Sequence, residues 1–247
     1  MAIVVDAPRR IGLARVLSKR GLCSRTQASE WIRAGRVQVD GRVVRDPEFP
    51  TIAGRHRIAV DGHGLDDAPR ERLHLVLNKP RGLVTTLRDE HGRDTVYRCF
   101  DAADLGFIAP VGRLDKASEG LLLFTNDPEW ASRITSPESG PDKTYHVQVD
   151  CIPDAAMLAK IQAGIAFESE WLRAKSASLL RTGAKNAWLE IVLDEGRNRQ
   201  IRRLLDAFDI GVLRLVRVAI GPLHLGELAK GQWRALTAEE VAALGGD

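Results

Sequence analysis

The sequence predicts an α+β protein with a small N-terminal domain and a larger C-terminal domain. Three observations support this: two short amphipathic helices with a hairpin at the start, a segment rich in Gly, Pro and charge after them, and strand-like runs that then outnumber helical ones. We expect the first domain over residues 1–60, a linker over residues 61–72, and the second domain over residues 73–247.

The N-terminal domain begins with two predicted helices. Apolar residues recur at helical spacing over residues 13–20, and Gly21 follows as a stop signal. Ser24 and Gln27 form a capping-box pattern that opens the second helix, and Gly35 ends it. This part of the chain is therefore expected to be a helical hairpin.

A β-hairpin and a basic balance follow the helices. The alternating runs 37–39 and 43–44 flank Asp40-Gly41, a strong hairpin turn. Residues 1–70 carry 13 Lys/Arg against 8 Asp/Glu, whereas the remaining residues carry 23 against 25, so the net charge of +3 originates in the N-terminal quarter. A local basic surface is typical of proteins that bind polyanions.

The C-terminal domain is predicted to contain a mixed, mainly antiparallel sheet around a central cleft. Its strands and helices lack the regular alternation of a doubly wound fold, and no Gly-rich phosphate loop occurs. Nucleotide cofactors are therefore not expected. Strands are expected at 73–77, 107–111, 121–124, 145–149, 188–193 and 212–220, and helices at 128–135, 154–163 and 198–208.

The segment Gly112-Arg113-Leu114-Asp115, continuing to Asp127, places a carboxylate immediately before an apolar strand. A loop at the rim of a sheet can present such a group to a substrate. A solvated surface turn is the alternative for a short tetrapeptide of this kind.

Composition excludes several classes of protein. Three scattered cysteines without a CxxC pair, and six histidines without ligand spacing, indicate neither a disulfide framework nor a metal site. No apolar run approaches the length of a membrane span. The first ten residues place an apolar patch before two arginines, the reverse of a secretory signal, so we expect a cytoplasmic protein.

The motifs resemble two known families. The N-terminal residues resemble the S4 RNA-binding domain, and the segment around Asp115 resembles the catalytic loop of the RsuA family of ribosomal RNA pseudouridine synthases. Further segments match that family's other motifs in the expected order: Asn78-Lys79-Pro80, Lys143-Thr144-Tyr145-His146-Val147, Gly196-Arg197-Asn198-Arg199-Gln200-Ile201-Arg202-Arg203-Leu204 and Leu215-Val216-Arg217-Val218-Ala219-Ile220-Gly221-Pro222-Leu223.

The resemblance implies an isomerase that acts on RNA without a cofactor or metal. Asp115 would be the catalytic aspartate, Tyr145 would lie against the target base, and Arg202 would pair with the carboxylate and keep it ionised. The residues expected to contact RNA are Arg20, Arg25, Arg33, Arg113, Lys143 and Arg199.

Two other functions are kept as alternatives. A non-catalytic RNA-binding factor for ribosome assembly would use the same scaffold. A glycosidase would need a second carboxylate, for which Glu119 and Asp127 are the candidates, and their replacement by amides is expected to cost little activity.

The substrate is less closely defined than the reaction. Large-subunit (23S) ribosomal RNA is slightly favoured over small-subunit (16S) RNA, with tRNA or a ribosome assembly intermediate as alternatives. A monomer is expected.

Overall fold

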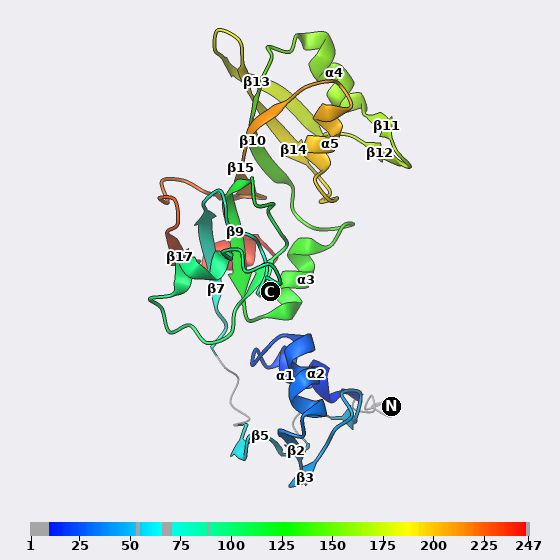
Figure 1. The fold of residues 1–247 in the computed structure, drawn as a ribbon, viewed down its shortest axis with the longest axis vertical. Coiled ribbons are helices and arrows are strands. Elements are labelled where there is room, and N and C mark those ends of the chain that lie inside the picture. The colour runs from blue at the N-terminus through cyan, green and yellow to red at the C-terminus, as the bar shows by residue number, and fades with distance from the viewer. Residues whose placement is uncertain (1–9, 53–54, 66–70, 88, 246–247) are drawn as a thin grey trace, which may run out of the picture. The chain divides into compact units, whose positions relative to one another are not determined.

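The computed structural model describes residues 10–52, 55–65, 71–87 and 89–245 of the 247-residue chain. It divides into two compact units (Figure 1). Unit 1 comprises residues 1–73 with the short segments 105–109 and 126–129, and unit 2 comprises the remainder.

Unit 1 opens with the two predicted helices, α1 (Leu13–Lys19) and α2 (Arg25–Arg33). The Ser24 side chain caps α2 by accepting a hydrogen bond from the backbone N–H of Gln27 at 3.1 Å. Gly21 and Gly35, after the two helices, have φ of +66° and +77°, a region that favours glycine. The helix ends inferred from the sequence are therefore confirmed.

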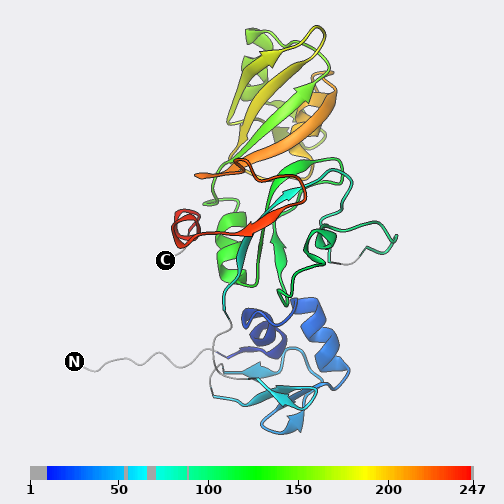
Figure 2. The same cartoon turned by 90° about the vertical axis from the view of Figure 1, so that its left-hand side faces the viewer.

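Two antiparallel sheets complete unit 1, and Figure 2 shows the helices stacked against its strands. The predicted turn at Asp40-Gly41 is present, with positive φ at both residues, and its two strands form part of a four-stranded sheet. That sheet has the order β3 (Arg42–Val43), β2 (Val37–Val39), β5 (Ile58–Val60), β6 (His63–Gly64), while β1 (Ile11–Gly12) pairs with β4 (Pro50–Thr51).

The expected linker over residues 61–72 is wrong at its N-terminal end. β6 pairs with β5 through Val60↔His63 and Ala59↔Gly64, so residues 61–65 continue the sheet of unit 1. Asp61-Gly62 has positive φ at both residues and forms a tight hairpin turn rather than a flexible connection. Residues 66–70 of the linker lie outside the described residues.

Unit 2 is built on a mixed, mainly antiparallel sheet, which confirms the predicted fold class. The main path has the order β13 (Ser176–Thr182), β14 (Ala187–Leu193), β10 (Lys143–Val149), β15 (Val212–Ile220), β9 (Glu119–Thr125), β7 (His74–Lys79), β17 (Trp233–Ala235), while β8 (Ala109–Val111) pairs with β9 and β16 (Leu223–His224) with β15. Along the main path, neighbouring strands are antiparallel except for β9 and β15, which run parallel at Val216↔Glu119 and Arg217↔Gly120.

The helices and remaining strands lie beside this sheet (Figure 1). The three helices expected from the sequence are present, and α4 packs against the edge strand β13. The elements are η1 (Val96–Phe100), α3 (Pro128–Thr135), α4 (Ala155–Ala163), the hairpin β11 (Ile165–Phe167) and β12 (Glu170–Leu172), α5 (Gln200–Asp206) and α6 (Ala238–Ala243).

Alternation of burial shows which face of the sheet is covered. Along β10, Tyr145, Val147 and Val149 are buried while the residues between them are partly exposed. One face therefore supplies the core of this region, and the other is open to solvent. Within the described ranges, no helix has the length and apolar character needed to cross a membrane.

Candidate active site

The Asp115 loop, residues 112–118, connects β8 to β9 in unit 2. Gly112 has φ of +72°, and the backbone N–H of Ser118 donates to the Asp115 carbonyl at 3.0 Å, which closes a turn. The Asp115 side chain is 35% exposed. The carboxylate therefore stands just before a central strand and remains accessible to a substrate.

Two arginines of the α5 region lie beside this loop. Arg199 brings its Nη1 to 4.0 Å from Asp115 Oδ2, and it precedes α5 in a left-handed conformation with φ of +49°. Arg202 donates through Nη2 to the Ala117 carbonyl and through Nη1 to the Val212 carbonyl, both at 3.4 Å. Among the described contacts, the nearest guanidinium to the carboxylate is thus that of Arg199, while Arg202 bridges the Asp115 loop to the start of β15.

Electrostatics supports the proximity of Arg202 to Asp115. Burial lowers the pKa of Arg202, the neighbouring Arg199 lowers it further, and the charge of Asp115 opposes both, followed by a smaller lowering from Arg81. The Nε of Arg202 is buried and has no hydrogen-bond partner in the described structure. The site therefore holds more positive charge than one carboxylate neutralises.

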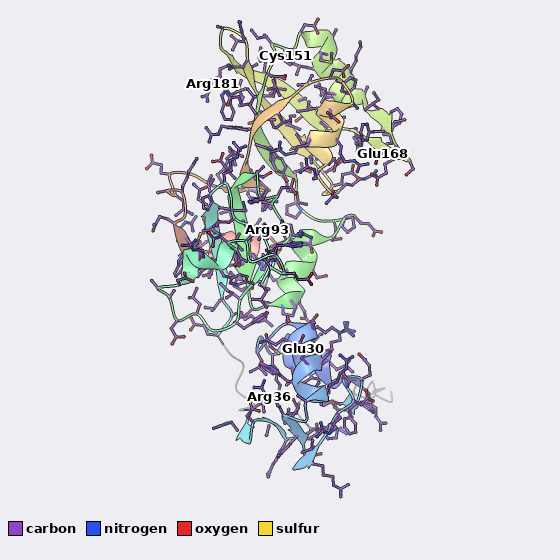
Figure 3. All side chains as sticks on the ribbon, in the orientation of Figure 1. Glu30, Arg36, Arg93, Cys151, Glu168 and Arg181 are labelled. Carbon is purple, nitrogen blue, oxygen red and sulfur yellow. The ribbon has the colours of Figure 1, made fainter. Side chains whose placement is uncertain are left out.

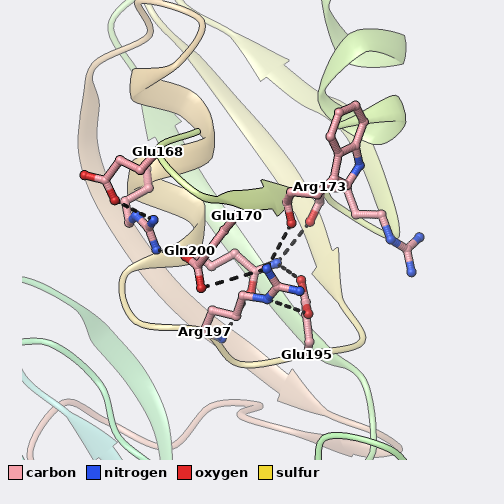
Figure 4. Close-up of polar contacts among 8 residues, drawn as sticks. Glu168, Glu170, Arg173, Glu195, Arg197 and Gln200 are labelled. Carbon is pink, nitrogen blue, oxygen red and sulfur yellow. Dashed lines mark hydrogen bonds and ion pairs between the residues drawn. The ribbon is translucent and has the colours of Figure 1, made fainter. Parts of the chain in front are cut away.

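A polar network fixes the start of α5, as the close-up in Figure 4 shows. The side chain of Gln200, only 2% exposed, donates to Glu195 Oε1 at 2.6 Å and to the Arg173 carbonyl at 3.1 Å. Arg197 pairs with Glu195 at 2.9 Å and donates to the Trp171 carbonyl at 3.1 Å. These bonds join the start of α5 to the β11–β12 hairpin, and they engage the residues on both sides of Arg199, Arg197 and Gln200.

Arg203 adds a second connection to the same hairpin. It contacts Glu170 at 2.6 Å and Glu168 at 2.9 Å, and its guanidinium lies over the Phe167 ring. Glu168 lies at the turn of the hairpin (Figure 3). The positive charge of Arg203 is therefore paired with two carboxylates of the protein itself.

Two buried charges lie at the C-terminal end of the Asp115 loop. Lys79, at the end of β7, is fully buried and donates from Nζ to the Ser118 carbonyl at 2.8 Å. Burial lowers its pKa to about 8, against the opposing effects of Asp115, Cys99 and Glu119. Glu119, 3% exposed, pairs with Arg214 at 3.1 Å and Lys230 at 2.5 Å.

Glu119 is thus neither solvated nor a partner for Asp115 in a carboxylate pair. Asp127, the other carboxylate considered from the sequence, is also buried, and it accepts a hydrogen bond from the Glu129 backbone N–H at the start of α3 at 3.0 Å. Both Glu119 and Asp127 are therefore bound to other groups of the protein.

Tyr145 and Arg217 form a row across the covered face of the sheet. They are directly opposite each other on β10 and β15, and Arg217 is in turn opposite Gly120 on β9. Opposed residues present their side chains on one face. Tyr145 is 9% exposed. Gly120, the last residue of the row, follows Asp115 by five positions in the sequence. The described contacts include no direct polar bond between Tyr145 and Asp115.

Arg217 is a buried cation that sequence reasoning did not select. It is 5% exposed, its Nε donates to the Leu121 carbonyl at 2.7 Å, and its Nη2 has no partner in the described structure. Lys79 was also not selected as a site residue. The available signal was a cation in a mostly apolar strand, where a buried charged residue is rare unless it is paired: Lys79 ends the run Leu75-Val76-Leu77-Asn78-Lys79, and Arg217 lies between Val216 and Val218.

The remaining predicted RNA contacts are distributed over both units. Arg113 is exposed beside Asp115, and Lys143 is partly buried at the start of β10, where burial and then Arg217 lower its pKa. In unit 1, Arg25 and Arg33 are exposed and Arg20 is half-buried. Their role in binding RNA stays a prediction.

A cavity of about 230 Å³ lies along one face of α5. Arg199, Arg202 and Arg203 line it together with Asp206 and residues 210–212. Over the described part of the chain, no group of three or more His, Cys, Asp or Glu residues is arranged to hold a metal ion, and the three cysteines are free thiols.

Comparison with known proteins identifies the family. Residues 73–207 match the RNA pseudouridylate synthase family, and residues 11–50 match the S4 domain. The chain belongs to the RNA pseudouridine synthases. Since the larger match covers β7 to α5, it contains Asp115, Tyr145 and Arg202.

Individual relatives cover almost the whole synthase. It is 37% identical over 236 residues to an uncharacterized RNA pseudouridine synthase of Aquifex aeolicus, covering 95% of this chain and 93% of that one. It is 36% identical over 234 residues to ribosomal large subunit pseudouridine synthase B of Bacillus subtilis, covering 94% of each. A pseudouridylate synthase of known crystal structure aligns with a TM-score of 0.65 and 31% identity, covering 95% and 99%.

The predicted family and enzyme class are therefore confirmed. The synthase is an isomerase of the RsuA type, with an N-terminal S4 domain.

Proposed function

We propose that this synthase converts a specific uridine of large-subunit ribosomal RNA to pseudouridine, with Asp115 as the carboxylate that acts at the sugar. The observation that carries the proposal is the placement of Asp115, partly exposed on a turn and adjoined by Arg199 and Arg202. The large-subunit substrate is supported by the name of the Bacillus subtilis relative.

The reaction breaks the N1–C1′ bond of uridine and joins C5 of the same base to C1′. The proton leaves C5 and N1 gains one, so no oxidation state changes. An ionised carboxylate can attack C1′, or can remove a sugar proton to give a glycal-like intermediate. Both routes need the same Asp115 anion, so the proposal holds for either.

The charges around Asp115 suit this requirement. The Nη1 of Arg199 lies 4.0 Å from Asp115 Oδ2, and Arg202 donates to the loop backbone at Ala117, so two guanidinium groups adjoin the loop that carries the anion. Tyr145 offers a fixed aromatic face on the covered side of the sheet, against which the detached uracil can turn.

We assign phosphate binding to the arginines of unit 1 and to Arg113. Extracting a base from its stack costs a few kcal/mol, and contacts to RNA phosphates offset that cost. Arg20, Arg25 and Arg33 carry this role in unit 1, and binding should weaken as salt concentration rises. We also propose that the protein is a monomer and that it is located in the cytoplasm.

The test is conversion of ribosomal RNA by purified protein, with pseudouridine mapped by nucleotide position. Wild type should modify large-subunit RNA at one position or a few, and Asp115→Asn should reduce the rate at least a thousandfold while RNA affinity stays within a few-fold. Asp209→Asn is the matched control, because Asp209 is exposed and its φ of +57° is tolerated by Asn.

Equal rates for wild type and Asp115→Asn would contradict the catalytic assignment. Wild type that binds ribosomal RNA but modifies no uridine would favour the assembly-factor alternative. Modification of small-subunit RNA or tRNA alone would change the substrate and leave the chemistry intact.

A further inference from the structure

Every backbone carbonyl of the Asp115 loop from Leu114 to Ser118 accepts a hydrogen bond. Loops of this kind usually satisfy part of their backbone with water, so five successive protein donors hold this one unusually firmly. The donors to residues 114, 115, 116, 117 and 118 are Thr85 Oγ1 at 2.7 Å, Ser118 N at 3.0 Å, Gly82 N at 2.8 Å, Arg202 Nη2 at 3.4 Å and Lys79 Nζ at 2.8 Å.

Thr85 makes the most specific of these contacts. Its hydroxyl donates to the Leu114 carbonyl at 2.7 Å and lies 3.4 Å from the Leu114 backbone N–H, which donates back to it. A hydroxyl has one donor and can accept as well, so a single side chain serves both backbone groups of the residue before Asp115. Thr85 is 7% exposed and Leu114 is 6% exposed, so water has little access to replace it.

The segment that carries Thr85 is itself fixed. The backbone N–H of Val84 donates to the Asp94 carbonyl at 3.0 Å, and the N–H of Val96 donates to the Val84 carbonyl at 3.0 Å. Val84 and Thr95 also form an isolated parallel bridge. The backbone immediately before Thr85 is therefore fixed by residues 94–96, at the start of η1.

We propose that Thr85 is a positioning residue for the isomerisation. Its hydroxyl fixes the peptide groups on either side of Leu114, and this sets the direction in which the next residue presents its carboxylate. The inference rests on the proposed role of Asp115. Because a misplacement of about 1 Å can reduce a rate about a hundredfold, loss of this one hydroxyl should be visible in the chemical step.

Thr85→Val and Thr85→Ser separate the hydroxyl from the volume of the side chain. Val keeps the shape and removes both hydrogen bonds, whereas Ser keeps the hydroxyl and removes a methyl group. We expect Thr85→Val to lower the single-turnover rate by about 10- to 100-fold with RNA affinity unchanged within about threefold, and Thr85→Ser to stay within about threefold of wild type.

Three controls guard against a merely structural explanation. Each variant is compared at equal folded fraction, judged by thermal unfolding, and Thr85→Ala is added because its smaller side chain admits a water molecule if Val prevents folding. Thr182→Val, at an exposed position of β13, controls for the chemical change itself. Thr85→Ala should be slowed about 10-fold or more relative to wild type, because a water molecule in the vacated space is not covalently attached to the segment that carries residue 85, and a rate equal to that of Thr85→Ser would overturn the inference.

The outcomes distinguish the inference from the proposed function. If wild type is active and Thr85→Val retains its rate within twofold, the inference is overturned and the function stands. If Thr85→Ser is as slow as Thr85→Val, side-chain volume is responsible and the inference is also overturned. If wild type forms no pseudouridine in any RNA, the proposed function and the inference fail together.

Discussion

Gly120 offers a quantitative test of the sheet that supports the Asp115 loop. It is opposite Arg217 in the parallel pair β9–β15, and its φ is +101°. A Cβ added there would lie 2.2 Å from the Arg217 carbonyl oxygen, where ordinary contact begins at 3.4 Å. Gly120→Ala therefore requires the strands to separate by roughly 1 Å.

Two contributions give the magnitude of the effect. Backbone strain for a residue with a side chain in such a conformation costs about 1–3 kcal/mol. Opening the strand pair weakens hydrogen bonds that contribute about 0.5–1.5 kcal/mol each. We expect Gly120→Ala to lower the free energy of unfolding of unit 2 by about 3–5 kcal/mol, which corresponds to roughly 10 °C in the midpoint of thermal unfolding.

Gly82→Ala is the matched control. Gly82 has the same φ of +101°, but no heavy atom lies within 4 Å of its added Cβ. It should show the backbone strain alone, about 1–3 kcal/mol. Urea titration followed by tryptophan fluorescence in a Trp31→Phe background reports unit 2, which holds the other four tryptophans. Equal destabilisation by the two substitutions would refute the steric argument.

Two further predictions concern the buried charges near the loop. Burial lowers the pKa of Lys79 to about 8 in the folded state, against about 10.5 in the unfolded state. Because the unfolded state binds more protons between these two values, the free energy of unfolding should rise from pH 8 to pH 10.5 by at most about 3 kcal/mol. This rise should be absent from Lys79→Gln when the two proteins are compared at each pH. A rise of equal size in the variant would contradict the burial of a charged Lys79. Glu119→Gln should lower the free energy of unfolding by about 1–3 kcal/mol, below the usual cost for a buried pair because Arg214 and Lys230 can regain water, and the rate per folded molecule should stay within a few-fold. Loss of activity as severe as in Asp115→Asn would instead restore the carboxylate-pair mechanism.

Those parts of the fold that carry a strong local signal were predictable from the sequence. The helices of unit 1 and the strands 145–149, 188–193 and 212–220 follow apolar periodicity, and the structure contains an element at each. The edge strand β13 was not predicted, because Leu179 and Leu180 are both exposed and a register shift interrupts its alternation. The hairpin β11–β12 was missed because its strands are three residues long and the connecting Glu168-Ser169 lacks a turn signal such as the Asp40-Gly41 that marks the equally short β2.

The candidate site shows a different limit. Motif order was sufficient to select Asp115, but the identity of its nearest cation depends on tertiary geometry that no spacing specifies. Arg199, which has a left-handed backbone conformation immediately before α5, comes closest to the Asp115 carboxylate. Arg202, about one turn further along, reaches the backbone of the loop at Ala117 instead. Similarly, the role of Thr85 depends on a contact between residues 29 positions apart in the sequence.

Four of the five donors that hold the Asp115 loop come from outside it, and this affects when the site can form during synthesis. Lys79 and Thr85 are made before Asp115, but Arg202 follows it by 87 positions. At about 5–20 residues per second, a nascent chain waits roughly 4–17 s between translating the carboxylate and completing its surroundings. A polypeptide still attached to the ribosome that makes it should therefore remain unable to modify the RNA around it until α5 has emerged.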